Sequence, residues 1–502
     1  MMNSQTQPIK RYRLNSSFIW LGLVQAITAL GVWAAASGGQ IFRAFALGSI
    51  TLSMITALAV SLEAALAAMI LFEPFRGVLR RLQYLIVPYS NSEPIHLITP
   101  IVAILTLIVL LSRHKFEIFR ATPLAAATSI LAAICFLQVF NPLQGSLSVG
   151  LVGALYFLVP MVWFYFGQAA NREFIPKILR FIVFLAVLTS LYGVYQLVIG
   201  YPAFEQVWLD NTDMYGSIAV YNVQRALATF SNSEEWGRYI QIGCLIAAGL
   251  FFTRSEGNKR IFWLGAAVSL MALLTLTGQR TSIFGLLLGL AILFLTGARN
   301  FSGAAIRAIL MLTPFVLMFA LVKPMSDDAG YESDDKIDAM MTHTSKGVVD
   351  PTGEGSFQIR LRTWTKIITE TLPSNPVGTG LGTTTLASTR QLADKDEAID
   401  NHILSLAVSA GVAAAILFVW ILFRALIFCF RGWRASEPDS EQADLWRIML
   451  ALTATFILNN FFGTSFTIYS VAPLGWLIIG WVSMSYAEMQ NSLPETEETI
   501  SN

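Results

Sequence analysis

The chain has 502 residues, of which 55% are hydrophobic and only 13% are charged, with a net charge of +1 and a mean hydropathy of +0.60. An ordinary soluble domain carries about 25% charged residues, so this composition excludes a soluble globular fold and predicts an integral membrane protein. The small net charge provides no basic field for nucleic acid. The three cysteines (Cys135, Cys244 and Cys429) lie in apolar runs, which favours packing roles over disulfides or a metal cluster.

The apolar segments predict the fold class. A helix needs about 20 apolar residues to cross a bilayer, and an open sheet edge cannot face lipid. Thirteen candidate segments occur, at residues 16–37, 44–72, 96–112, 122–140, 147–167, 175–200, 237–253, 260–277, 281–297, 303–323, 402–429, 446–463 and 466–487. We therefore expect an all-α polytopic membrane protein in which residues 1–487 form one transmembrane domain with about twelve true crossings. The polar, acidic stretch 488–502 is expected to be a disordered cytoplasmic tail.

Charged loops predict the orientation from residue 113 onward. Basic residues concentrate in short loops, as is typical of the cytoplasmic side. They include Arg113 with Lys115, Arg172 with Lys177 and Arg180, Lys259 with Arg260, Arg299 with Arg307, and Arg431 with Arg434. The two long loops, 201–236 and 324–400, then lie outside, and the second holds thirteen Asp/Glu against seven Lys/Arg.

The first 112 residues leave the topology open. Three spans from a cytoplasmic N-terminus would place Arg113 outside. Either one segment does not cross, or 44–72 is a split hairpin around Glu63, or the N-terminus is external. The stretch from Glu73 to Arg81 is expected to be a helix lying in the membrane interface.

Arg280 separates two apolar runs in the short turn Thr277-Gly278-Gln279-Arg280. An arginine at a membrane mouth is expensive unless it is paired or hydrated. It is either a snorkelling interfacial residue or an anion clamp, because the guanidinium fork matches phosphate oxygens.

The end of the long acidic loop holds further candidates. Arg360 and Trp364 are one helical turn apart, so they share a face, and Arg362 lies between them. Arg362 is either a binding residue or a solvated partner of the loop's acids. The glycine-rich run 376–382 then ends the helix, and we expect a tight turn that lets backbone approach a ligand.

His402 follows Asp400 and Asn401 at the start of the predicted span 402–429. A histidine is the natural general base near neutral pH, and a neighbouring carboxylate can orient it. The other histidines, His96, His114 and His343, lack such surroundings in the sequence. With no second His or Cys at ligand spacing, a transition-metal site is not expected.

The earlier outer loop contributes Arg225. Tyr201, Trp208, Tyr215 and Tyr221 lie upstream of it, mixed with Asp and Asn. Such aromatic residues suit sugar binding, but for each one individually an interfacial aromatic belt is the commoner explanation.

Taken together, the motifs resemble the O-antigen ligase and O-antigen polymerase superfamily of bacterial membrane glycosyltransferases. The resemblance covers roughly residues 120–485. It is carried by Arg225 to Phe230, the Thr-Gly-x-Arg turn at Arg280, Arg360 with Trp364 and the following Pro-x-Gly-x-Gly, and His402 opening the next span.

The resemblance implies a GT-C-like fold and a metal-independent, inverting transfer without a cofactor. The donor would be an undecaprenyl-diphosphate-linked glycan, used at the periplasmic face of the bacterial inner membrane in O-antigen, capsule or exopolysaccharide synthesis. The acceptor would be a hydroxyl of a lipid-linked glycan or of the lipid A core. Arg280 and Arg360 would hold the diphosphate and His402 would activate the acceptor. A polysaccharide flippase and a chain-length regulator are the implied protein partners.

Two questions stay open at this stage. The two arginine-bearing outer loops favour polymerisation slightly over ligation, because a polymerase holds two lipid-linked glycans. The rival class is a transporter of a small anion such as bicarbonate, or of a lipid-linked sugar. A transporter should show charged residues near the bilayer midplane, where Glu63 is the only acid that the sequence places.

Overall fold

The computed structural model describes residues 39–90, 93–212, 219–220, 223–253, 257, 259–297, 336–349, 355–385 and 399–492, with the single positions 303, 305, 309 and 313. The predicted span 16–37, nearly all of the predicted span 303–323, parts of the loop 324–400 and the last ten residues of the predicted tail lie outside the described residues.

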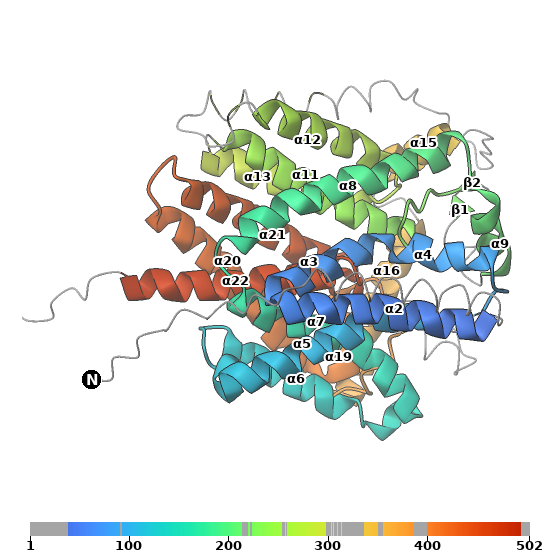
Figure 1. The fold of residues 1–502 in the computed structure, drawn as a ribbon, viewed down its shortest axis with the longest axis horizontal. Helices are drawn as coiled ribbons and strands as arrows, with labels where there is room; N and C mark the ends of the chain where they lie inside the picture. Colours follow the sequence, from blue (N-terminus) through green and yellow to red (C-terminus); the bar gives the residue numbers. More distant parts are fainter. Residues whose placement is uncertain are drawn as a thin grey trace, which may run out of the picture.

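The described chain is almost entirely helical, and most helices run side by side in one bundle (Figure 1). The helices of the first half are α2 (Gly39–Val60), α3 (Leu62–Phe72), α4 (Arg76–Leu82), α5 (Ile98–His114), α6 (Ala125–Gln138), α7 (Leu147–Ala169), α8 (Phe174–Val198), α9 (Ala203–Asn211) and α11 (Ser233–Phe252). Those of the second half are α12 (Arg260–Thr275), α13 (Arg280–Gly297), α15 (Lys336–Val349), α16 (Gly355–Lys366), α17 (Leu372–Ser374), α19 (His402–Ala410), α20 (Val412–Ala435), α21 (Glu441–Phe461) and α22 (Ala472–Ser492). A two-stranded antiparallel hairpin, β1 (Ala219–Val220) with β2 (Val223–Gln224), is the exception.

Six of these helical segments are long and apolar enough to cross a membrane: Gly39–Val60, Pro94–His114, Leu147–Ala169, Phe174–Val198, Arg280–Gly297 and Val412–Ala435. The apolar helices α6 and α12 are shorter. The central helices α11, α21 and α22 have 20, 21 and 21 residues and bury most of their surface. The chain is therefore an all-α membrane-embedded protein, and the count of twelve crossings stays a prediction.

The predicted segment 44–72 is a helical hairpin. Ser61, in an extended conformation, separates α2 from α3 and caps α3 by accepting a hydrogen bond from the Ala64 amide. The chain then returns to its starting level, because Arg43 near the start of α2 donates to the carbonyl of Pro88 and pairs with Glu93. The structure thus has a helical hairpin in this segment, with its turn two residues before Glu63, and the side of the membrane on which the N-terminus lies stays a prediction.

The expectation of an interfacial helix at residues 73–81 is wrong. Glu73, Arg76 and Arg81 are only 4%, 2% and 0% exposed. The guanidinium of Arg81 donates to Glu205 at 2.6 Å and to the carbonyls of Ala228 and Phe230, so its charge and donors are satisfied inside the protein.

The predicted span 402–429 is broken into two helices. Gly411, at φ 96°, separates α19 from α20. The rings of His402 and Phe418 lie 4.9 Å apart, whereas a straight helix would separate these residues by about 24 Å. α19 therefore folds back beside α20, which places the His402 ring next to Phe418 of α20.

Close contact of α7 and α22 holds the centre of the bundle together. A Cβ atom at Gly167 would overlap the carbonyl oxygen of Leu477, and one at Gly480 would overlap that of Phe164. Small residues that allow backbones to touch are typical of helix packing in membranes.

The two ends of the bundle differ. The end that carries α4, α9 and α15, on the right of Figure 1, is called the site end. At the opposite end Arg172, in one of the short basic loops, pairs with Glu488 of α22 at 2.5 Å. Because α22 continues to Ser492, residues 488–492 are helical and do not belong to a disordered tail.

Candidate functional site

Three helices begin close together at the site end. The Asn232 side chain caps α11 by accepting from the Glu235 amide at 2.7 Å, and Asn401 caps α19 by accepting from the Leu404 amide at 2.9 Å. The turn before α13 is tied to α11 by Gln279, which donates to Ser233 at 3.3 Å. Helix N-termini present a positive potential, so this junction favours negatively charged groups.

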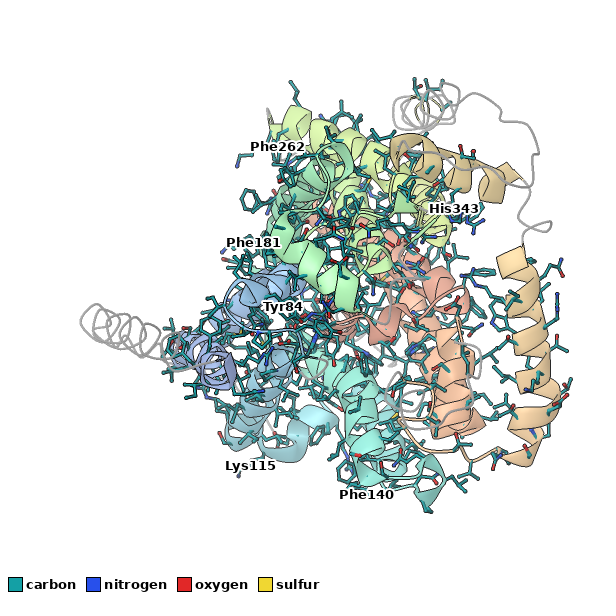
Figure 2. All side chains as sticks on the ribbon, turned by 90° about the vertical axis from the view of Figure 1, so that its right-hand side faces the viewer. Tyr84, Lys115, Phe140, Phe181, Phe262 and His343 are labelled. Atoms are coloured by element: carbon teal, nitrogen blue, oxygen red, sulfur yellow. The ribbon has the colours of Figure 1, made fainter. Side chains whose placement is uncertain are left out.

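Arg225, Arg280 and His343 meet at this junction and are called the arginine–histidine site. Arg225 follows β2, and its Nη2 lies 3.3 Å from Nε2 of His343 on α15. Arg280 at the start of α13 lies within electrostatic range of the same imidazole. Gly278 lies against both Arg225 and His343, since a Cβ there would be 3.4 Å from the His343 ring and 3.8 Å from the Arg225 guanidinium. Figure 2 looks onto the site end and labels His343.

The protonation of His343 follows from these neighbours. Burial and the positive charges of Arg225 and then Arg280 lower the pKa of His343 to about 3. Since arginine only donates hydrogen bonds, Nε2 is the acceptor and the single ring proton is on Nδ1. Besides burial, the two guanidinium groups keep His343 neutral, so the electrostatic potential at this point of the site end is positive.

A second group of charged residues, Glu234, Arg238, Arg360 and Asp400, is called the ion-pair cluster. Arg360 contacts Asp400 through Nε at 3.1 Å and Nη2 at 3.0 Å, and Arg238 contacts Glu234 at 3.5 Å. Arg238 lies within electrostatic range of both Arg360 and Asp400. Trp364 stands one turn after Arg360, with its ring 6.1 Å from that of Phe462. Arg360, Trp364 and Asp400, three of the predicted site residues, are thus brought together.

His402 does not have the surroundings expected from the sequence. Its imidazole is 2% exposed and lies among Phe157, Phe418 and Phe466, with ring centroids 5.6, 4.9 and 6.1 Å away. Asp400 is engaged by Arg360, and Nδ1 of His402 has no hydrogen-bond partner in the part of the chain that the structure describes. The reason is the reversal of the chain at Gly411, which turns the ring inward. Only the backbone of His402 reaches the site, by donating to the Gly463 carbonyl at 2.9 Å.

Two further sequence predictions concern Arg362 and the glycine-rich turn at residues 376–382. Arg362 is exposed on α16, on another side of the helix from Arg360 and Trp364. The glycine-rich turn packs on protein: Gly378, at φ 103°, meets the backbone of Ala410 and Gly411, and Val377 accepts from Gln138 at 2.8 Å. It closes over α6 and α19 and does not approach the arginine–histidine site.

The aromatic residues Tyr201 and Trp208 of the loop 201–236 make contacts within the protein. Trp208 is 2% exposed, and the guanidinium of Arg80 lies 4.9 Å from its ring. The hydroxyl of Tyr201 donates to the carbonyl of Arg225, which positions that arginine. Tyr215 and Tyr221 lie outside the described residues.

Sequence reasoning missed His343 and Arg238. His343 lies in an acidic loop among residues that show no motif, and only the packing of α15 brings it to Arg225. Arg238 lies one turn after Glu234 in Glu234-Glu235-Trp236-Gly237-Arg238. That i, i+4 spacing on a helix was the available signal for its ion pair.

Among the described residues, no group of three or more His, Cys, Asp or Glu side chains could hold a metal ion. No protein-family model matches the chain, and no curated protein is significantly similar to it.

Proposed function

We propose that the chain transfers an undecaprenyl-diphosphate-linked glycan to the hydroxyl of an acceptor sugar at the site end of the membrane, in the polymerisation or ligation of a surface or exported polysaccharide. The observation that supports this most is the arginine–histidine site, where two guanidinium groups from distant segments meet at one end of an apolar bundle. A lipid-linked donor needs both features: a bilayer for its tail and a cationic mouth for its diphosphate.

The chemistry fits this arrangement. Negative charge develops on the diphosphate as the glycosidic bond breaks. Guanidinium groups placed in advance stabilise that charge more in the transition state than in the ground state. The acceptor hydroxyl loses its proton as its oxygen bonds to the anomeric carbon, and the diphosphate leaves with the bonding electrons.

Two histidines are candidates for the acceptor's base. His402 matches the family pattern, and it could reach the site only by rotating out of its aromatic surroundings. His343 already lies beside Arg225 in its neutral form, which is the form that accepts a proton. We propose His402 as the base, and the comparison of its variants with those of His343 tests that choice.

The proposed orientation follows the positive-inside rule. The short loop with Arg172 lies at the end opposite the arginine–histidine site, and the sequence predicts that this loop is cytoplasmic, so that end would be cytoplasmic. The site would then face the periplasm from the bacterial inner membrane, with a flippase and a chain-length regulator as partners.

The test in cells is polysaccharide chain length at matched protein levels in the variants Arg280→Ala, Arg360→Ala, His343→Ala and His402→Ala. Loss of long chains with accumulation of short lipid-linked units supports polymerisation, and long chains retained on the carrier support ligation. Unchanged polysaccharide in every variant refutes the proposal.

Transport is the second candidate, because one observation favours it. Glu73, Arg76 and Glu235 form a buried ionic network, with Arg76 3.4 Å from Glu73 and 3.5 Å from Glu235. A cavity of about 10 Å³ beside it is lined by Glu73, Tyr239, Tyr469 and Ser470, which is room for one water. Glu63, in contrast, lies near one end of the bundle, where it accepts from the Asn171 amide. Flux of bicarbonate or lipid-linked sugar in proteoliposomes, abolished by Glu73→Gln, would favour transport over transfer.

A further inference from the structure

Some polar atoms of the ion-pair cluster are buried without a partner. Arg238 is 2% exposed, and its Nε and Nη1 have no hydrogen-bond partner among the described residues. The same holds for Nε1 of Trp364. Buried donors of this kind normally have a hydrogen-bond partner, and a buried arginine N–H without one costs its full desolvation free energy.

The cluster also offers acceptors that a ligand can reach. The side chain of Asp400 is 48% exposed and that of Glu234 is 36% exposed, whereas Arg238 beneath them is 2% exposed. Four separate segments converge here. A Cβ at Gly463 would overlap Nη2 of Arg238, which places the chain after α21 against α11, and Asp400 joins α16 to the start of α19.

This composition differs from that of the arginine–histidine site. Two carboxylates balance the two guanidinium groups, so a phosphate entering here would have to displace a carboxylate. A sugar hydroxyl both donates and accepts, and it can therefore bond to a carboxylate and to an N–H donor together. The ring of Trp364 adds an apolar face with a polar edge.

We infer that the ion-pair cluster, together with Trp364, is a sugar-binding subsite for the glycan, separate from the anion site at Arg225, Arg280 and His343. This inference rests on the proposed function and assigns Arg360 to the sugar instead of the diphosphate. Arg238 and Trp364 donate to hydroxyl oxygens, and Asp400 and Glu234 accept from hydroxyl groups.

The test measures binding of two probes to the purified full-length chain in lipid nanodiscs. One probe is the oligosaccharide released by mild acid from the lipid-linked glycans of the cells that make the protein, and the other is inorganic diphosphate. Asp400→Asn and Trp364→Ala are expected to weaken oligosaccharide binding about tenfold, since each removes a buried or charged hydrogen bond, and to leave diphosphate binding unchanged. Arg280→Gln should show the reverse pattern.

Lys366→Gln, at an exposed position on the same helix as Trp364, is the matched control and should change neither affinity. Trp364→Phe keeps an aromatic ring and removes the N–H, so it gives a second measurement should Trp364→Ala unfold in thermal melts. Oligosaccharide binding that is absent in the wild type, unchanged in Asp400→Asn and Trp364→Phe, or lost in step with diphosphate binding overturns the inference. Selective loss of oligosaccharide binding in a protein that shows no glycan transfer would uphold the subsite and refute the transferase.

Discussion

The protonation of His343 is the most direct physical signature of the arginine–histidine site. Replacing Arg225 by Gln removes a positive charge whose nearest nitrogen is 3.3 Å from the imidazole. At an effective dielectric constant of 20, unit charges about 4 Å apart interact by about 4 kcal/mol. Partial exposure reduces this, so we expect Arg225→Gln to raise the pKa of His343 substantially from its value of about 3. Burial, the first cause of the shift, should keep it below the ordinary histidine value.

Nitrogen-15 NMR of histidine-labelled protein measures this effect. The chain has only four histidines, so His343→Gln and His402→Gln assign the spectrum. In the wild type His343 should be neutral at pH 5 with its proton on Nδ1, and in Arg225→Gln it should titrate at higher pH. Inorganic diphosphate should shift the wild-type titration in the same direction, because it neutralises the two arginines. A wild-type midpoint near 6.5, or no change in Arg225→Gln, would refute the reasoning.

Four further results are expected. His343 is neutral in the folded protein and its pKa is higher in the unfolded chain, so its contribution to stability should be present above about pH 6.5 and fall as the pH drops below that value. Thermal melts at several pH values measure this, and His343→Gln should lose the pH dependence that the wild type shows. Glu205→Gln should lower the free energy of unfolding by about 3–5 kcal/mol because it strands the fully buried guanidinium of Arg81, and Glu173→Gln, an exposed pair member, should leave the melt unchanged. Gly480→Ala should lower the melting temperature by forcing α22 from α7, and Gly265→Ala, with open space around it, should not. Maleimide should label none of the three buried cysteines until the protein is unfolded, and rapid labelling of the native protein would contradict the packing of α6, α11 and α20.

The membrane helices were predictable because hydrophobic length alone specifies them. The predicted spans 147–167 and 175–200 match α7 (Leu147–Ala169) and α8 (Phe174–Val198) within a few residues. The reversal at Gly411 was not predictable in this way. Most of its flanking residues are apolar, with Ser405 and Ser409 as isolated exceptions, so hydropathy continues across the break, and only the positive φ of one glycine marks it.

The site was predictable at the level of single arginines and not at the level of their partners. Arg280 stood out because a charge at a membrane mouth is expensive, and Arg225 stood out because it begins the motif Arg225 to Phe230. The pairing of Arg360 with Asp400 and the burial of His402 depend on how α16 and α19 pack, and no local pattern records that packing. For the same reason His343 was found only from its contact with the distant Arg225.

The central claim is tested most directly by glycan transfer in liposomes that contain only the purified chain and lipid-linked glycan from its own cells. Products are separated by length, and the released lipid diphosphate is quantified. The account predicts longer or transferred glycans with the wild type and with Lys366→Gln, and a rate about 100-fold lower with Arg280→Gln. Equal rates for the wild type and Arg280→Gln, or no transfer by the folded wild type, would contradict it.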